Sequence, residues 1–94
     1  MEPHPAWAEH THLFPGAQVR VDGLTEPEPA ALHLRLSDGT EVEAELLTGP
    51  HGALVEVAGY TSAAGTRLPA RGWPVRSWER AGDGVVLRLG RASG

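Results

Sequence analysis

Residues 32–46 read LHLRLSDGTEVEAEL, and this stretch decides the fold. Three leucines alternate with His33 and Arg35 before the Asp-Gly pair, and three glutamates alternate with apolar residues after it. A period of two is that of a strand with one buried face, and Asp-Gly between two such runs favours a tight turn. The stretch therefore predicts a β-hairpin.

The length of the turn sets the register of this hairpin. A two-residue turn at Asp38 and Gly39 places Leu36 opposite Glu41, so that the apolar face of one strand meets the charged face of the other. A three-residue turn with Gly39 in the left-handed conformation restores the match between the faces. We therefore expect the second register, in which the pairs are Leu34 with Val42, Arg35 with Glu41 and His33 with Glu43.

Short strands and turn residues alternate along the rest of the chain. Strand patterns occupy 19–22, 53–58, 73–80 and 85–89, and a turn at 81–84 joins the last two. Turn signals at intervals of roughly eight to twelve residues are typical of small barrels and sandwiches. We expect an all-β fold, a small and strongly bent SH3-like barrel of roughly five to six strands, with an OB-like barrel as the alternative. The conformation of Gly59–Gly72 stays open at this stage.

The N-terminal segment has a different period. Trp7, His10 and Phe14 fall at positions i, i+3 and i+7, on one face of a helix, and Pro5 suits a first helical turn. We predict a short helix over Ala6–Phe14 that docks on the barrel, with a disordered tail as the alternative. The chain then divides into an N-terminal arm at 1–16, a barrel domain at 17–90 and a C-terminal tail at 91–94.

A pattern in the first half of the chain resembles the start of SH3-like and Sm-like barrels. It consists of Val-x-Val, a loop, and then Leu-x-Leu-x-Asp-Gly-x-x-Val-x-x-x-Leu. The residues that carry the resemblance are Val19, Val21, Leu34, Leu36, Asp38, Gly39, Val42 and Leu46. The resemblance covers about a third of the chain and implies a barrel without implying a function.

The composition excludes several classes of protein. The chain of 94 residues has no cysteine, which excludes disulfides and thiolate metal sites. It has no apolar run of the roughly 18 residues that a membrane span needs and no leader pattern at its start. We therefore expect a cytoplasmic protein with no membrane partner.

Charge is distributed unevenly along the chain. The formal net charge is −4, and all eight basic residues are arginine. Residues 1–56 hold ten acidic residues and two arginines, whereas residues 57–94 hold six arginines and two acidic residues. The asymmetry gives two differently charged faces, suited to an acidic partner or to self-association, or an even surface if the halves interleave in one barrel.

Two arrangements of histidines have spacings that could suit metal binding or acid–base catalysis. His10 and His12 lie about 200° apart on a helix and share a metal ion only on a strand, so the predicted helix argues against a metal site. His33 opposite Glu43 has the composition of an acid–base pair, but on the outer face of a hairpin we interpret it as a surface contact. No nucleophile elbow, phosphate-binding loop or His-Glu-x-x-His motif occurs. We therefore expect no enzyme activity, no cofactor and no metal.

Arginine and aromatic residues gather in the C-terminal third of the chain. Trp and Arg dominate protein–protein hot spots, and Trp beside Arg also suits single-stranded nucleic acid. The predicted partner-binding residues are Tyr60, Arg67, Arg71, Arg76, Trp78, Arg80 and Arg88.

The orientation of Trp78 depends on the register of the last hairpin. With Val75 opposite Leu89 and Ser77 opposite Leu87, Trp78 stands outside as a binding platform. With Trp78 against Leu87, the neighbouring arginines are drawn toward the core, which is costly without partners. We favour the first register.

The predicted function is a small non-catalytic protein-interaction module that binds through an exposed Trp/Arg surface of the C-terminal hairpin. Its partner is a protein, with another copy of this chain as one candidate. The first alternative is a barrel that binds single-stranded nucleic acid, which the net charge of −4 disfavours. The second alternative is a small-molecule binder or small enzyme without a recognisable motif.

Overall fold

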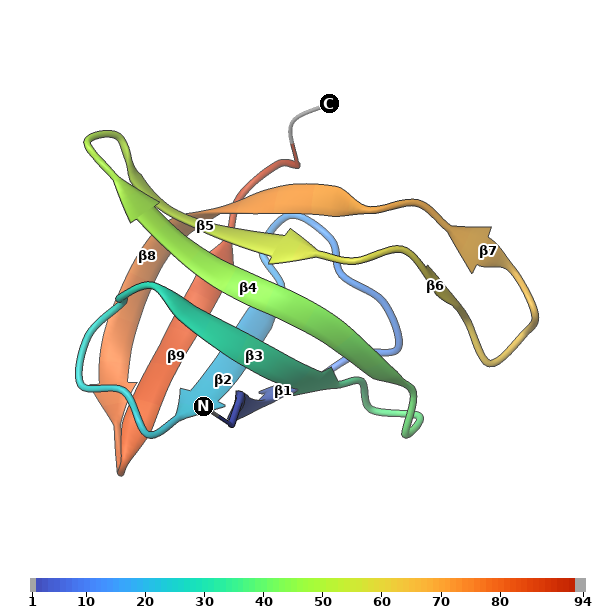
Figure 1. The fold of residues 1–94 in the computed structure, drawn as a ribbon, viewed down its shortest axis with the longest axis horizontal. Helices are drawn as coiled ribbons and strands as arrows, with labels where there is room; N and C mark the ends of the chain where they lie inside the picture. The colour runs from blue at the N-terminus through green and yellow to red at the C-terminus, as the bar shows by residue number, and fades with distance from the viewer. Residues whose placement is uncertain (1, 93–94) are drawn as a thin grey trace.

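The computed structural model describes residues 2–92, which form strands, turns and loops without a helix. The strands are β1 His4–Ala8, β2 Gln18–Asp22, β3 Ala30–Arg35, β4 Glu41–Gly49, β5 Gly52–Val57, β6 Tyr60–Thr61, β7 Arg67–Leu68, β8 Arg71–Ala81 and β9 Gly84–Leu89. Seven of them close into a barrel in the order β1-β2-β9-β8-β5-β4-β3. The strands β6 and β7 form a separate ribbon that projects from the barrel (Figure 1). The prediction of a small all-β barrel is confirmed, and none of the described segments is a helix that could cross a membrane.

The hairpin of β3 and β4 has the register that its sequence predicts. Its pairs include Leu34 with Val42, Arg35 with Glu41 and His33 with Glu43. Gly39 has φ of +90°, and the Leu36 amide donates to the carbonyl of Thr40 at 2.8 Å. The left-handed glycine therefore closes a three-residue turn and keeps the leucines on the buried face.

The predicted helix over Ala6–Phe14 is wrong, because the start of this segment is the strand β1. Ala6 and Ala8 are buried, and Trp7 between them is 39% exposed, so the period here is two. The strand pairs antiparallel with β2 and parallel with β3, and thereby closes the barrel. Two unpaired strand edges offer more hydrogen bonds to these few residues than a short isolated helix does. The prediction failed because the pattern of Trp7, His10 and Phe14 spans the end of the strand.

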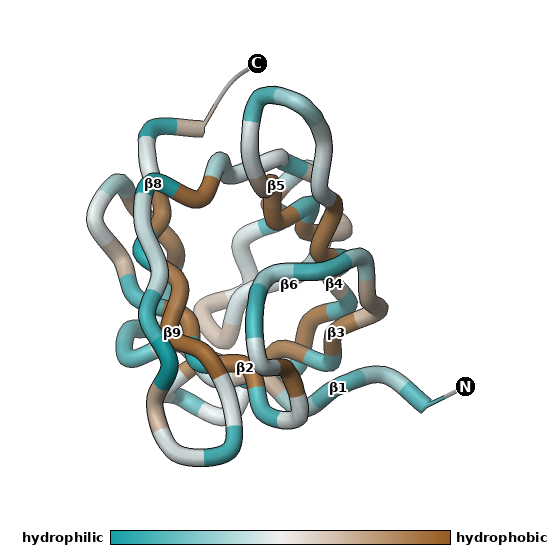
Figure 2. Tube along the Cα trace, turned by 90° about the vertical axis from the view of Figure 1, so that its left-hand side faces the viewer, coloured by the Kyte–Doolittle hydropathy of each residue, from teal (hydrophilic) through white to brown (hydrophobic). Residues whose placement is uncertain are grey.

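The core is aliphatic and follows the alternation of the strands. In Figure 2 the hydrophobic stretches of β2, β3, β5 and β9 surround the middle of the molecule, and the turns are hydrophilic. The largest fully buried side chains are Leu34, Leu46, Leu87, Leu89, Val19, Val21, Val55 and Val85. No polar or charged residue of the described part is buried, so the interior is apolar.

A β-bulge shifts the pairing within the β8–β9 hairpin. The observed pairs are Val75 with Leu89, Ser77 with Arg88 and Trp78 with Leu87. The first agrees with the prediction, and the predicted pairing of Ser77 with Leu87 is wrong. Arg76 is the extra residue of the bulge, and one extra residue reverses the faces of all that follow.

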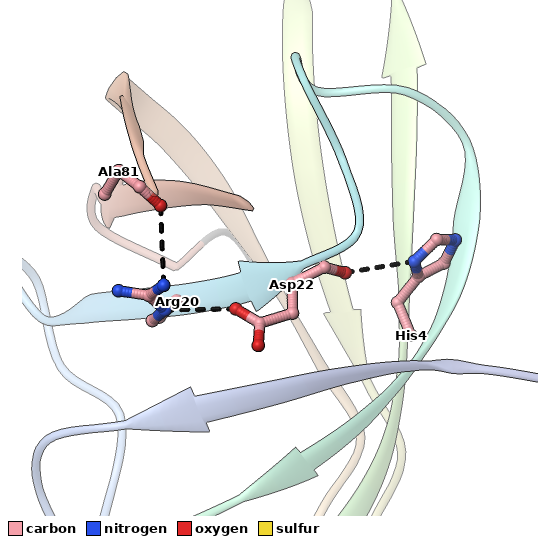
Figure 3. A network of polar contacts seen from close by, with 4 residues as sticks. All are labelled: His4, Arg20, Asp22 and Ala81. Carbon is pink, nitrogen blue, oxygen red and sulfur yellow. Dashed lines mark hydrogen bonds and ion pairs between the residues drawn. The ribbon is translucent and has the colours of Figure 1, made fainter. Parts of the chain in front are cut away.

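Polar contacts fasten the end of this hairpin to the barrel (Figure 3). The Nε of Arg20 on β2 donates to Asp22 Oδ1 at 3.0 Å, and its Nη2 donates to the carbonyl of Ala81 at 3.4 Å. His4 Nδ1 lies 3.1 Å from the carbonyl oxygen of Asp22. These contacts join β1, β2 and the end of β8, so the hairpin is held beside β2.

Candidate functional site

The predicted site residues separate into two groups at different places on the barrel. Tyr60, Arg67 and Arg71 lie on the β6–β7 ribbon and at the start of β8. The second group lies on the β8–β9 hairpin and consists of Arg76, Trp78, Arg80 and Arg88. The structure therefore presents two candidate surfaces in place of one.

At the second group, β8 continues beyond the strand that covers one of its sides. The last pair between β5 and β8 is Leu54 with Pro74, whereas β8 runs on to Ala81 beside β9 alone. Within the described chain no strand pairs with residues 75–81 on the side away from β9. We call this side of residues 75–81 the open edge.

Backbone hydrogen bonds at the ends of β9 show which of its main-chain groups face each neighbouring strand. The N–H of Gly23, just after β2, donates to the carbonyl oxygen of Asp83 at 3.0 Å, and the N–H of Leu89 donates to that of Ala17 at 2.9 Å. The N–H of Gly90 donates to the carbonyl oxygen of Pro74 on β8 at 2.7 Å. Main-chain groups alternate in direction along an antiparallel strand. Odd-numbered residues of this segment therefore bond toward β2, and even-numbered residues bond toward β8.

The same alternation determines the main-chain groups at the open edge. Ser77, Glu79 and Ala81 lie opposite even-numbered residues of β9, so their N–H and C=O groups bond to β9. The N–H and C=O groups of Trp78 and Arg80 then point away from β9, toward the open edge. Among residues 2–92 no turn or loop hydrogen-bonds to these groups. The open edge thus offers two donors and two acceptors at the spacing of a strand.

Trp78 is 45% exposed at this edge. It shares a face with Leu87, whose side chain is buried, but β5 has ended here and leaves the indole uncovered. Trp78 lines a depression of about 310 Å³ with Pro27 of the β2–β3 loop and Ala53 near the β4–β5 turn. The bulge turns Trp78 to the face of Leu87, so its exposure results from the early end of β5 and not from the register that the sequence predicted.

Three arginines of the β8–β9 hairpin lie close to Trp78 along the strands without an ion-pair partner among residues 2–92, and the register places Arg88 on the opposite face from Trp78. A second hollow, of about 500 Å³, has Arg76 and Arg88 in its lining together with Gln18, Glu79 and Val86, so two arginines face one carboxylate there. Arg80 is exposed on β8 close to the turn. Within the described chain none of these three arginines forms an ion pair. Their charge is therefore available to an acidic partner.

Tyr60 and Arg71 of the first group line a half-open cleft between the β6–β7 ribbon and the loop that follows β1, whereas Arg67 lies outside the lining. We call this cleft the ribbon cleft; its volume is about 310 Å³, and it is lined by His12, Leu13, Val57, Tyr60, Leu68, Pro69, Arg71 and Trp73. The Arg71 guanidinium carbon lies 5.9 Å from the centre of the Trp73 ring. Partial burial raises the pKa of Tyr60, and the negative charge of Asp38 adds to the effect.

The histidines that the sequence singles out contact other side chains of the described residues. Residues 2–92 contain no group of three or more side chains that could hold a metal ion. His10 and His12 lie against Phe14, with ring centres 4.8 and 5.4 Å from that of Phe14. His33 lies 3.5 Å from Glu41, on the exposed face of its hairpin. These contacts are those of surface side chains.

Sequence reasoning missed the residues that shape both surfaces. Pro27 and Ala53 beside Trp78, and Leu13 and Leu68 in the ribbon cleft, come from loops and strand ends far apart in the chain. One feature of the sequence pointed to the open edge: the strand pattern at 73–80 is longer than the strand pattern at 53–58.

Protein-family models, curated proteins and solved structures were all compared with the chain, and none of them matches it.

Proposed function

We propose that this protein is a non-catalytic interaction module that receives an extended segment of a partner protein along the open edge of β8. The observation that carries the proposal is the direction of the main-chain groups of Trp78 and Arg80 toward an edge with no strand. Addition of a strand to an exposed edge is a common mode of peptide recognition, in which main-chain bonds supply affinity.

Side chains around the edge supply selectivity. Trp78 offers a large apolar surface that becomes buried when a segment lies over it, and such residues dominate interface energies. Arg76, Arg80 and Arg88 favour an acidic segment over a basic one. A partner strand with alternating acidic and apolar residues fits this combination.

Another copy of the chain is one such partner, and geometry defines its register. Two β8 edges related by a two-fold axis pair antiparallel, and only residues with groups on the open edge exchange hydrogen bonds. A register centred on Glu79 places Trp78 of each copy opposite Arg80 of the other. The indole of Trp78 in each copy then meets the guanidinium of Arg80 in the other, which gives two favourable contacts. The same register places the two Glu79 carboxylates opposite each other, which is unfavourable.

Two substitutions test the edge separately from the side chains. Trp78→Ala removes the apolar contact, and Arg80→Pro removes an open-edge N–H while leaving the bonds to β9 in place. We expect both to abolish capture of the partner in pull-downs, and to convert any dimer seen by sedimentation into monomer. Trp7→Ala is the matched control, because Trp7 is the other exposed tryptophan and lies on β1.

The outcomes separate the candidate functions. Capture or dimerisation that survives both substitutions contradicts the proposal. Binding to an oligonucleotide that weakens steeply with salt and depends on Trp78 and the arginines favours the nucleic-acid alternative instead.

A further inference from the structure

The ribbon cleft lies away from the open edge and has the properties of a ligand site. Its volume of about 310 Å³ is that of a small-molecule pocket, and such pockets are mostly apolar with a few polar groups. Side chains from four separate segments converge there: the loop after β1, the end of β5, the ribbon and the start of β8.

The walls of the ribbon cleft suit a flat, apolar body. Tyr60 and Leu68 are a cross-strand pair of the ribbon, and both line the cleft and are partly buried. Trp73, which is 6% exposed, belongs to both the core and the cleft lining. Leu13 lines the cleft from the loop after β1. An aromatic ring has aromatic and aliphatic surfaces to contact here.

The ribbon cleft has one arginine in its lining, and the negative charge of Asp38 reaches Tyr60 from outside the lining. Arg71 is part of the lining, and Arg67 stands opposite Thr61 on the ribbon. Neither arginine forms an ion pair within residues 2–92, and no carboxylate lines the cleft. A carboxylate beside Arg71 would receive charge-assisted hydrogen bonds that a neutral group of the same shape forms less strongly.

From this combination we propose that the ribbon cleft binds a small aromatic carboxylate, with the ring between the ribbon and Trp73 and the carboxylate on Arg71. The proposal concerns a different surface from the open edge and stands or falls independently of it.

A pair of probes of nearly equal shape tests the charge. 2-Naphthoate and 2-naphthamide are titrated separately into the 15N-labelled protein, and the amide signals are followed by NMR. We expect the acid to bind about tenfold more tightly than the amide, with shifts at Leu13, Leu68 and the Trp73 indole. Signals of Trp78 and Arg80 serve as internal controls for the other surface and should stay in place.

Substitutions test the assignment to Arg71. Arg71→Gln should remove the preference for the acid and leave the weak binding of the amide, while Arg76→Gln on the other surface should change neither. Both arginines are exposed, and the dispersion of the NMR spectrum reports whether each variant is folded.

Three results would overturn the proposal. The first is equal affinity for the acid and the amide in the wild-type protein, a comparison that requires no variant. The second is a set of shifts that maps outside the ribbon cleft, or no shifts at millimolar probe. The third is an undiminished preference for the acid in folded Arg71→Gln.

Discussion

Glu41 is paired with Arg35 in the register of the β3–β4 hairpin and also forms an ion pair with it. Arg35 Nη2 donates to Glu41 Oε1 at 2.8 Å, and His33 Nε2 lies 3.5 Å from the same oxygen. The hydrogen bond from Arg35, followed by that from His33, lowers the pKa of Glu41 below its usual value of 4.5. A carboxylate with a lowered pKa stabilises the fold above its unfolded pKa, and this contribution is lost as the pH falls through the folded pKa.

We therefore expect Arg35→Gln to raise the pKa of Glu41 toward 4.5, and His33→Gln to raise it less. Carbon-detected NMR titration of the side-chain carboxyl measures both. The difference in unfolding midpoint between wild type and Glu41→Gln should be present at neutral pH and vanish in acid below the folded pKa. If the pKa of Glu41 is the same in Arg35→Gln as in the wild type, the cross-strand pair of Arg35 and Glu41 has no electrostatic coupling.

Position 84 requires glycine because the main chain of β2 leaves no room for a Cβ there, and not because of a positive φ. A Cβ at this buried position would overlap the carbonyl oxygen of Val21 and lie 2.9 Å from Asp22 Cα, both main-chain atoms of β2. We expect Gly84→Ala to lower the free energy of unfolding by about 1–3 kcal/mol, measured by urea denaturation. Gly49→Ala is the control, because a Cβ there has nothing within 4 Å, and it should cost nothing.

At the scale of the element, β1 shows how a strand with few apolar residues closes a barrel. Ala6 is 1% exposed between β2 and β3, whereas its neighbour Trp7 is 39% exposed. We expect Ala6→Asp to destabilise the protein by about 3 kcal/mol, since it buries an unpaired charge, and Trp7→Asp to cost much less. Thermal unfolding of the two variants compares them. A larger loss for Trp7→Asp would be the pattern of a docked helix and would contradict the strand.

The sequence predicts elements well where period and turn chemistry agree. In the β3–β4 hairpin, alternation and Gly39 both point to one register, and that register is observed. At β1 the local pattern favours a helix, and the pairing with β2 and β3 that overrides it is invisible in the sequence. At β8 nothing in the pattern locates the bulge at Arg76, on which the face of Trp78 depends. The arginines of both surfaces and Trp78 could be named in advance, but not the separation of the two surfaces.

At the scale of the whole molecule, the strand order preserves part of the charge asymmetry of the chain. Glu43, Glu45 and Glu56 line one hollow on β4 and β5, whereas Arg76, Arg80 and Arg88 lie on β8 and β9. In the barrel order β8 and β9, which come from the arginine-rich half of the chain, stand next to each other between β5 and β2 of the acidic half. The molecule therefore carries an acidic side at β4 and β5 and an arginine-rich side at β8 and β9, a distribution that suits oriented association.

The acidic side destabilises the barrel, because Glu45 and Glu56 are directly opposite each other on adjacent strands. Like charges at opposed positions repel, and an opposite pair in the same place attracts, so we expect Glu56→Arg to raise the free energy of unfolding by about 0.5 kcal/mol at low salt. The screening length falls from about 10 Å at 0.1 M to about 3 Å at 1 M, so the gain should shrink in urea titrations at 1 M salt. Glu28→Arg makes the same change in net charge from an exposed loop position outside the sheet. An equal gain from Glu28→Arg would show that total charge, and not the pairing across β4 and β5, sets the electrostatic cost of this fold.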